Sequence, residues 1–185
     1  MINTLNQYKY INTSNVKMNI QKLKIRILKS QDISENYLRW LNDPEITKFS
    51  NNQYKNHSLE KQKKYLNDCL IDSNIDLYGI FYVNKHVGNI SINDINNIHK
   101  RSEITYVLGD RSYWSKGIMS ASIKIIVLKA KKDYKLNKLF ASCANENFAS
   151  RRVLEKNGFI LEGTRKKHLF FQKKWYDQLD YGLIL

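Results

Sequence analysis

The sequence contains few of the residues that break a chain or cross-link it. Its 185 residues include one proline, Pro44, seven glycines and two cysteines, Cys69 and Cys143. Because no proline-rich or glycine-rich linker interrupts it, the chain gives no sign of division into several domains. Two cysteines are too few for a disulfide scaffold, and they show no metal-ligand spacing with the four histidines, which argues against a structural zinc site.

Long apolar runs are also absent. The most apolar segment, residues 118–130, is interrupted by two serines and two lysines, whereas a membrane-spanning helix needs about 20 mostly apolar residues. The N-terminal residues are polar and rich in asparagine, and they lack the apolar stretch of a secretory signal. We therefore expect a cytoplasmic protein with a flexible leader over residues 1–21 and one folded domain over residues 22–185.

Aromatic residues and positive charge are abundant. Twelve Tyr, seven Phe and three Trp, with 42% apolar residues overall, supply too much core material for a disordered chain. The formal net charge is +14, and residues 111–185 hold 16 Lys and Arg against 6 acids. This excess favours an anionic partner, and phosphorylated cofactors, nucleic acid and anionic membrane surfaces all fit it.

The apolar pattern predicts strands and helices in a mixed order. Alternating apolar residues predict strands, and apolar residues at helical spacing behind a capping residue predict helices. The predicted strands cover residues 23–27, 77–83, 87–93, 102–108, 139–144, 165–171 and 175–185. The predicted helices cover residues 32–42, 58–72, 118–134 and 147–157. We expect residues 84–86 to form a hairpin turn and Gly158 to end the last helix in a left-handed conformation. The order is typical of a mixed α/β layer fold.

The first segment that carries chemistry is the turn between the predicted strand 102–108 and the helix that begins at Ile118. At a helix start the unpaired backbone N–H groups and the helix dipole attract an anion. Gly117 lets the backbone approach closely, Lys116 adds a charge, and Ser120 adds a hydroxyl donor. The pattern predicts a pyrophosphate site, although a glycine in such a turn also serves turn geometry alone.

The second such segment is the predicted helix 147–157. Read as a surface helix, it has Asn147 as its N-cap and buries Val153 and Leu154. It follows the first segment after one helix and one strand. The two segments in this order are a more specific signal than either segment alone.

Together these segments resemble the GNAT superfamily of acyl-coenzyme A N-acyltransferases, in the branch of the ribosomal-protein N-terminal acetyltransferases. The resemblance covers residues 23–185 and implies a mixed, mostly antiparallel central sheet with helices on both faces. It also implies acetyl-CoA as acyl donor, a primary amine as acceptor and no metal. The blocks that carry it are Arg39–Glu45, Glu103–Leu108, Tyr113–Met119, Asn147–Ser150 with Glu155–Phe159, and Leu161–Thr164.

The resemblance implies where the coenzyme binds. The superfamily's phosphate loop falls on residues 112–117, with Ser112 in place of Gln or Arg and Ser115 in place of the first glycine. Backbone N–H groups make most of the contacts, so Ser115 suits the loop if its φ stays negative. The pantetheine arm would bond to Asn147 and add to the edge where the strand ending at Val107–Leu108 leaves its neighbour. The predicted coenzyme-binding residues are Val107, Leu108, Trp114, Ser115, Lys116, Gly117, Ile118, Met119, Ser120, Asn147 and Lys156.

Three residues are catalytic candidates. By the same resemblance Glu103 takes the proton of the amine, often through water, and Ser150 protonates the leaving thiolate, because Leu154 stands where many members have tyrosine. His168 has the titration range for a proton relay. Each has a structural alternative: an exposed glutamate at a strand end, a serine that stabilises a helix start, and a histidine that only packs.

The acceptor and the class of function stay open at this point. The resemblance places the acceptor near Trp40 and residues 42–45. The candidate acceptors are a protein N-terminus, a nucleotide-linked amino sugar, a polyamine, an aminoglycoside and another small amine. The positive charge disfavours a polycation. A basic nucleic-acid-binding domain and a coenzyme A binder without catalysis are the alternatives, although the chain shows no helix-turn-helix or aromatic single-strand platform. We expect no membrane partner, and a homodimer stays open.

Overall fold

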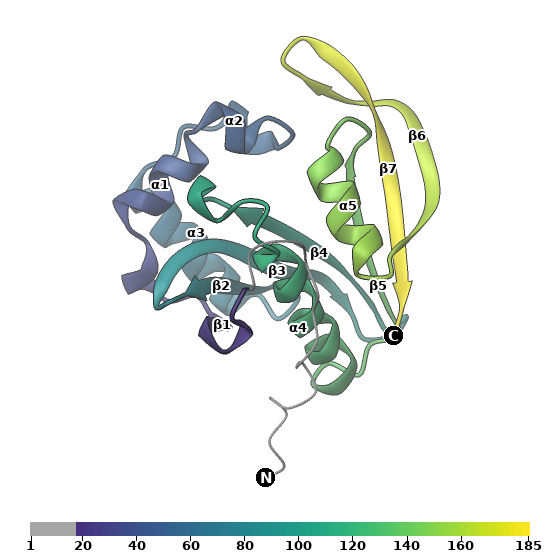
Figure 1. Cartoon of the computed structure of the whole chain (residues 1–185), viewed down its shortest axis with the longest axis horizontal. Helices are drawn as coiled ribbons and strands as arrows, with labels where there is room; N and C mark the ends of the chain where they lie inside the picture. The colour runs from purple at the N-terminus through teal and green to yellow at the C-terminus, as the bar shows by residue number, and fades with distance from the viewer. Residues whose placement is uncertain (1–17) are drawn as a thin grey trace.

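The chain folds around one seven-stranded sheet (Figure 1). The computed structural model describes residues 18–185, so residues 1–17 of the expected leader lie outside the described residues. The helices are α1 (Glu35–Leu41), α2 (Pro44–Thr47), α3 (Leu59–Ile71), α4 (Ile118–Lys132) and α5 (Phe148–Lys156). The strands are β1 (Leu23–Ile27), β2 (Asp76–Tyr82), β3 (Lys85–Asn96), β4 (Arg101–Leu108), β5 (Lys138–Ala144), β6 (Ile160–Phe171) and β7 (Lys174–Ile184). Short 3₁₀ turns are η2 (Ile20–Lys22), η3 (Ser30–Asp32), η4 (Asn51–Tyr54) and η5 (Arg111–Tyr113).

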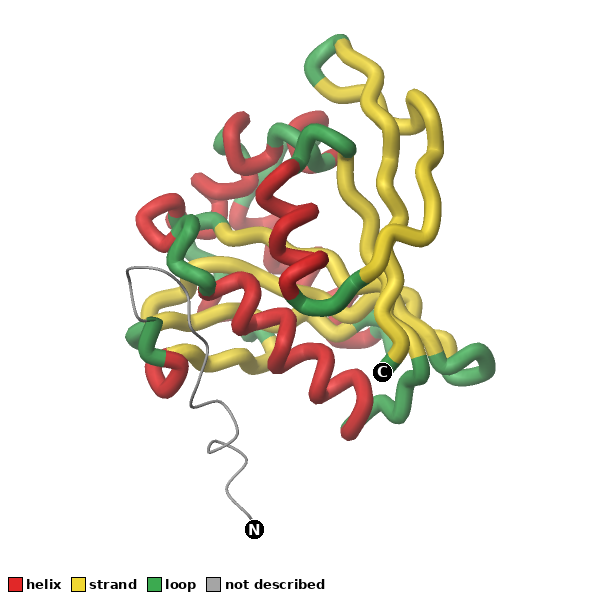
Figure 2. The backbone as a smooth tube through the Cα atoms, turned by 45° about the vertical axis from the view of Figure 1, so that its right-hand side comes forward, coloured by secondary structure: helices red, strands yellow, loops and turns green. Residues whose placement is uncertain are grey.

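The sheet is mixed and mostly antiparallel, as expected. Its strand order is β1-β2-β3-β4-β5-β7-β6, and only the central β4–β5 pair is parallel. That pair is joined only from Arg101–Lys138 to Glu103–Phe140. Beyond this point the two strands diverge, and Figure 2 shows the two halves of the sheet turning apart.

Helices cover both faces of the sheet, which confirms that prediction. Neighbouring residues of a strand point to opposite faces, and the adjacent residues Leu77 and Tyr78 of β2 show the result. Leu77 packs in a cluster with Tyr37 of α1 and Leu66 of α3, whereas Tyr78 packs in the larger cluster that includes Ile123 of α4. The sheet therefore has an apolar core on each side, and a third, smaller cluster contains Ala144, Phe171 and Tyr176.

Side-chain caps set the helix boundaries that the sequence indicates most clearly. Ser58 accepts a hydrogen bond from the backbone N–H of Lys61 at the start of α3, and Asn147 accepts one from Ser150 at the start of α5. These bonds satisfy N–H groups that have no partner within the helix. Gly158, with φ of 85°, follows α5 in the left-handed conformation that was predicted.

Several predicted boundaries are wrong, among them those of the strand predicted over residues 87–93, which runs from Lys85 to Asn96. The hairpin turn is Val83–Asn84 rather than residues 84–86, because both residues adopt positive φ (52° and 59°) and make a two-residue turn that matches strand twist. The helix predicted from Asp32 begins at Glu35, because Ser34 is its N-cap. The helix α4 ends at Lys132 rather than residue 134, and β6 begins at Ile160 rather than residue 165 because Ile160 pairs with β7.

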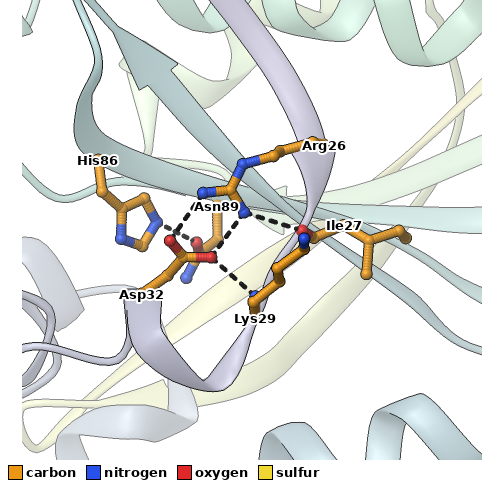
Figure 3. Close-up of polar contacts among 6 residues, drawn as sticks. All are labelled: Arg26, Ile27, Lys29, Asp32, His86 and Asn89. Carbon is orange, nitrogen blue, oxygen red and sulfur yellow. Dashed lines mark hydrogen bonds and ion pairs between the residues drawn. The ribbon is translucent and has the colours of Figure 1, made fainter.

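Asp32 ties β1 to the turn that leads into α1 (Figure 3). Both of its carboxylate oxygens accept hydrogen bonds from the Arg26 guanidinium at 2.7 Å, and Oδ2 also accepts one from the Lys29 N–H at 2.8 Å. Burial by itself would raise the pKa of Asp32, but the Arg26 and Lys29 donors outweigh it and lower the pKa. The pair therefore stabilises the fold in its charged form.

We predict that Asp32→Asn lowers the free energy of unfolding at pH 7 by about 1–3 kcal/mol, because a charge-assisted pair of bonds is lost. A carboxyl whose folded pKa is lowered contributes stability above its ordinary value of 3.8 and loses it as pH falls through the folded value. The difference between wild type and variant should therefore shrink in denaturation curves recorded below that ordinary value. An equal difference at pH 7 and pH 3 would contradict this account.

Candidate active site

A large cleft opens where β4 and β5 diverge. Its volume is about 1310 Å³, and its lining comes from both halves of the molecule. The walls are formed by α1, α2, η4 and the start of α3 on one side and by α5 on the other. The floor is formed by β3 and β4, and the turn before α4 forms one end.

The turn before α4 has the geometry of an anion site. Gly117 is the N-cap of α4 with φ of 79°, and no side chain caps the first N–H groups of this 15-residue helix. These groups and the helix dipole are therefore free to bind an anion from the cleft. Ser115 has φ of 59°, so the condition that its φ stays negative is not met. Ser115 and Gly117, the left-handed residues before and after Lys116, bend the chain tightly enough to bring it from η5 into α4.

Most of the predicted coenzyme-binding residues line the cleft. The two exceptions are Lys116, which is exposed with its Nζ 5.6 Å from the ring centre of Tyr113, and Ile118, which is 1% exposed in the core. Arg152 and Lys156 on α5 add positive charge to the lining. The predicted residues found in the lining are Val107, Leu108, Trp114, Ser115, Gly117, Met119, Ser120, Asn147 and Lys156.

Ser150 lines the cleft and contacts a residue that the sequence analysis missed. The Oη atom of Tyr106 on β4 lies 2.7 Å from Ser150 Oγ, across the gap between β4 and α5. Burial raises the pKa of Tyr106, and the hydrogen bond with Ser150 opposes this only in part, so the phenol stays protonated at neutral pH. Strand alternation places Ile104 and Tyr106 on the same face of β4. That alternation was visible in the sequence, but the proximity of Ser150 was not.

Cys143 of β5 extends this network on the other side of Ser150. Burial raises the pKa of its thiol to about 11, and a hydrogen bond with Ser150 acts in the opposite direction. The thiol is therefore uncharged at neutral pH, and the serine hydroxyl lies among protonated neighbours.

The structure does not bring Glu103 and His168 into the large cleft. Glu103 lines a separate pocket of about 550 Å³ with Phe140 and Asp180. Thr105, two residues along the same face of β4, does line the cleft, so Glu103 is about 7 Å from it along the strand. Burial raises the pKa of Glu103, and the carboxylates of Asp94 and Asp180 raise it further. His168 is exposed on β6 and lines neither pocket.

The floor of the cleft beyond β4 is polar and uncharged. Asn89 and Ser91 of β3 are each 5% exposed, and Ser91 Oγ lies 2.7 Å from Oγ1 of Thr105 on β4. Burial raises the pKa of Tyr37 to about 12, and its hydrogen bond with Asn89 acts in the opposite direction. Hydroxyl and amide groups, rather than carboxylates, therefore face a molecule bound at this end.

An aromatic contact closes the cleft toward the β6–β7 hairpin. The Tyr54 hydroxyl of η4 donates to the Phe170 carbonyl at 2.7 Å, and the Tyr54 ring stacks on Phe171. Phe49 meets Tyr176 edge to face at 5.5 Å between ring centres. The segment between α2 and α3 is thus held against the C-terminal hairpin.

His57, which also lines the cleft, has both ring nitrogens engaged. Its Nε2 donates to the Asn52 carbonyl and its Nδ1 accepts from the Gln62 amide, each at 3.0 Å. Within residues 18–185 no group of three or more His, Cys, Asp or Glu side chains is arranged to hold a metal. In the same residues no helix has the length and apolarity needed to cross a membrane.

Comparisons with known proteins agree with this architecture. The family described as acetyltransferase (GNAT) domain matches residues 22–160. A ribosomal-protein-serine acetyltransferase of Escherichia coli is 31% identical over 109 residues, which are 59% of this chain and 60% of that protein. The match thus spans less than two thirds of that relative.

Solved structures with the same fold include enzymes that are named for different acceptors. A ribosomal L7/L12 alpha-N-protein acetyltransferase in complex with coenzyme A matches with a TM-score of 0.81 and 24% identity, over 91% of this chain and 97% of the other. A spermidine N-acetyltransferase of Vibrio cholerae, in complex with coenzyme A and spermine, matches with a TM-score of 0.79 and 18% identity, over 89% and 96%. At these identities the likeness concerns the fold.

The left-handed turn before α4 gives a testable expectation. Ser115→Gly should raise the free energy of unfolding by about 1 kcal/mol, because glycine adopts positive φ without the steric cost that a side chain has there. The matched change Gly117→Ala should lower it by about the same amount. Chemical denaturation of the two variants measures both, and a destabilised Ser115→Gly variant would contradict the positive φ.

Proposed function

Because the chain belongs to the acetyltransferase (GNAT) domain family, we propose that it is an acetyl-CoA-dependent N-acetyltransferase acting on a primary amine. The observation that carries this proposal is the early end of the β4–β5 ladder after Glu103–Phe140. It leaves an open strand edge between an anion-binding helix start and a hydroxyl pair. An extended, phosphorylated thioester fits such an edge, whereas the binding of nucleic acid does not require an open strand edge.

The coenzyme would lie along β4. Its pyrophosphate would accept hydrogen bonds from the N–H groups at the start of α4, where Gly117 allows close approach. Arg152 and Lys156 on α5 line the same cleft and would attract its phosphates. The pantetheine arm would add to β4 beyond Glu103, like an extra strand, because β5 no longer pairs there.

The chemistry requires three proton and charge movements. The amine nitrogen attacks the thioester carbonyl carbon, a tetrahedral intermediate forms, and the C–S bond breaks as the amide forms. Backbone N–H groups near Val107 or Leu108 would stabilise the oxyanion. Ser150 would donate its proton to the leaving thiolate, and Tyr106, 2.7 Å away and kept protonated by burial, would donate in turn to Ser150.

Glu103 is the base in this proposal, through water. A carboxylate with a raised pKa holds a proton more strongly than an ordinary one, which suits it to take a proton from an amine. Its distance of about 7 Å from the cleft lining calls for at least one bridging water. His168 has no support from the geometry of the described residues as a relay.

The function is tested by release of free coenzyme A thiol from acetyl-CoA with a panel of primary amines. We expect release by the wild-type protein and about a 10²-fold lower kcat for Ser150→Ala, because the proton donor to sulfur is lost. Binding of acetyl-CoA to Ser150→Ala, measured by calorimetry, should stay close to wild type. Tyr106→Phe keeps the serine hydroxyl and should lower kcat about fivefold, as expected for one lost hydrogen bond.

Two outcomes would contradict the function. Binding of acetyl-CoA without thiol release from any amine would favour a coenzyme binder without catalysis. If acetyl-CoA does not bind, and oligonucleotides bind in a salt-sensitive way, the result would favour a nucleic-acid-binding domain.

Glu103 gives a pH-dependent expectation. The base acts as a carboxylate, so kcat/KM should fall as pH decreases through its pKa, and that fall should occur above the ordinary glutamate value of 4.5 because the pKa is raised. Glu103→Gln should lower kcat/KM by about 10²-fold at pH 7 and remove the acidic limb. The exposed Glu35→Gln is the matched control, and a pH profile that Glu103→Gln leaves unchanged would assign the base elsewhere.

A further inference from the structure

The positively charged residues that line the cleft fall into two groups. Arg152 and Lys156 lie on α5, whose C-terminal end meets the start of α4 through the hydrogen bond from the Asn157 amide to Ser120 Oγ. Lys48, Lys55 and Lys61 lie between α2 and the first turn of α3, on the opposite wall. In Figure 1 α2 lies next to α1 at the upper left, whereas α5 lies on the right, beside β6 and β7. Phosphates held at α4 and α5 account for the first group and leave the second, which we name the lysine wall, without a partner.

No described acid neutralises the lysine wall. Within residues 18–185 none of its three lysines forms an ion pair. The Nζ atom of Lys48 lies 5.5 Å from the centre of the Phe49 ring, and that of Lys61 donates to the Asn56 carbonyl at 3.2 Å.

The two acids of the cleft do not reverse this balance. Glu146 is paired with Lys174 at 2.6 Å, which leaves Glu45 as the one lining carboxylate without a described ion pair. Asp43, next to α2, is engaged by Arg111 and does not line the cleft. The wall therefore carries a net positive charge toward the cleft.

The floor beside the lysine wall also lacks the groups that a polyamine needs. Additional ammonium groups of an acceptor would require carboxylates near them. The residues that line this part of β3 and β4, Asn89, Ser91 and Thr105, are neutral. Their hydroxyl and amide groups can orient an uncharged amine, while the lysines attract an anionic group attached to it.

Resting on the N-acetyltransferase function proposed above, we propose that the acceptor is a primary amine that also carries a phosphate or carboxylate group. The amine lies over Thr105, and the anionic group contacts Lys48, Lys55 and Lys61. A phosphorylated amino sugar and a peptide N-terminus followed by acidic residues both offer this chemistry.

Binding is measured first, by calorimetry with coenzyme A present, because it does not depend on turnover. The probes are glucosamine 6-phosphate against glucosamine, a tetrapeptide amide with three acidic residues against its neutral amide counterpart, and spermidine. We expect at least one anionic probe to bind about tenfold more tightly than its neutral counterpart, and added salt to weaken that probe alone. The pair that shows the preference identifies the source of the anionic group.

Variants test whether the lysine wall causes the preference. Lys48→Ala, Lys55→Ala and Lys61→Ala should each weaken binding of the preferred anionic probe about two- to fivefold, as for partly exposed ion pairs, and leave its neutral counterpart unchanged. Lys63→Ala, exposed on α3 and outside the cleft lining, is the matched control and should change neither.

Equal binding of both members of each pair, or tightest binding of spermidine, would overturn the inference. So would a preference that survives all three wall variants. Thiol release, measured in separate reactions with the same amines and with acetyl-CoA in place of coenzyme A, decides the function independently. Turnover of neutral amines alone would support the acetyltransferase function and contradict the proposed acceptor class. If the lysine wall prefers the anionic probes but no amine is acetylated, the proposed class of ligand is correct and the catalytic function is wrong.

Discussion

The end of hydrogen bonding between β4 and β5 after Glu103–Phe140 is the constraint on which the site depends. The two strands pair for only three residues and then separate, so the backbone groups of β4 that face β5 lack a partner strand beyond that point, while the other edge of β4 stays paired with β3. The sheet remains one structure because β5 continues to pair with β7 along its whole length. The opening is therefore built into the core of the fold, between two well-paired halves, rather than added on a surface loop.

Two features on the sides of this opening have related physical causes. The start of α4 presents unsatisfied N–H groups because Gly117 is in a left-handed conformation and has no side chain to cap them. The start of α5 is capped by Asn147, which holds Ser150 in the first turn, 2.7 Å from the Tyr106 hydroxyl on β4. One helix start thus offers positive potential to an anion, and the other holds one member of a hydroxyl pair.

The wall of the cleft opposite α5 is held in place by contacts with β1 and with the C-terminal hairpin. The Arg26–Asp32 pair holds the turn before α1 against β1, and the Phe49, Tyr54, Phe171 and Tyr176 contacts join the segment after α2 to the C-terminal hairpin. Between these anchors lie the lysines that distinguish this wall from α5. The fold is shared with proteins named for different acceptors, a ribosomal protein and spermidine, so the sheet by itself does not decide the acceptor.

The sequence by itself determined the mixed α/β order, most of the strands, and the helix starts at Ser58 and Asn147, because periodicity and capping act between residues that are close in the chain. Its resemblance to a known family also marked Gly117 and Ser150. The tertiary structure alone decided that Tyr106 reaches Ser150, that Glu103 lies outside the cleft lining, and that Ser115 is left-handed. It also brought Lys48, Lys55 and Lys61 to the wall opposite α5. These facts depend on where two strands diverge and how distant segments pack, and no local pattern of residues records such distances.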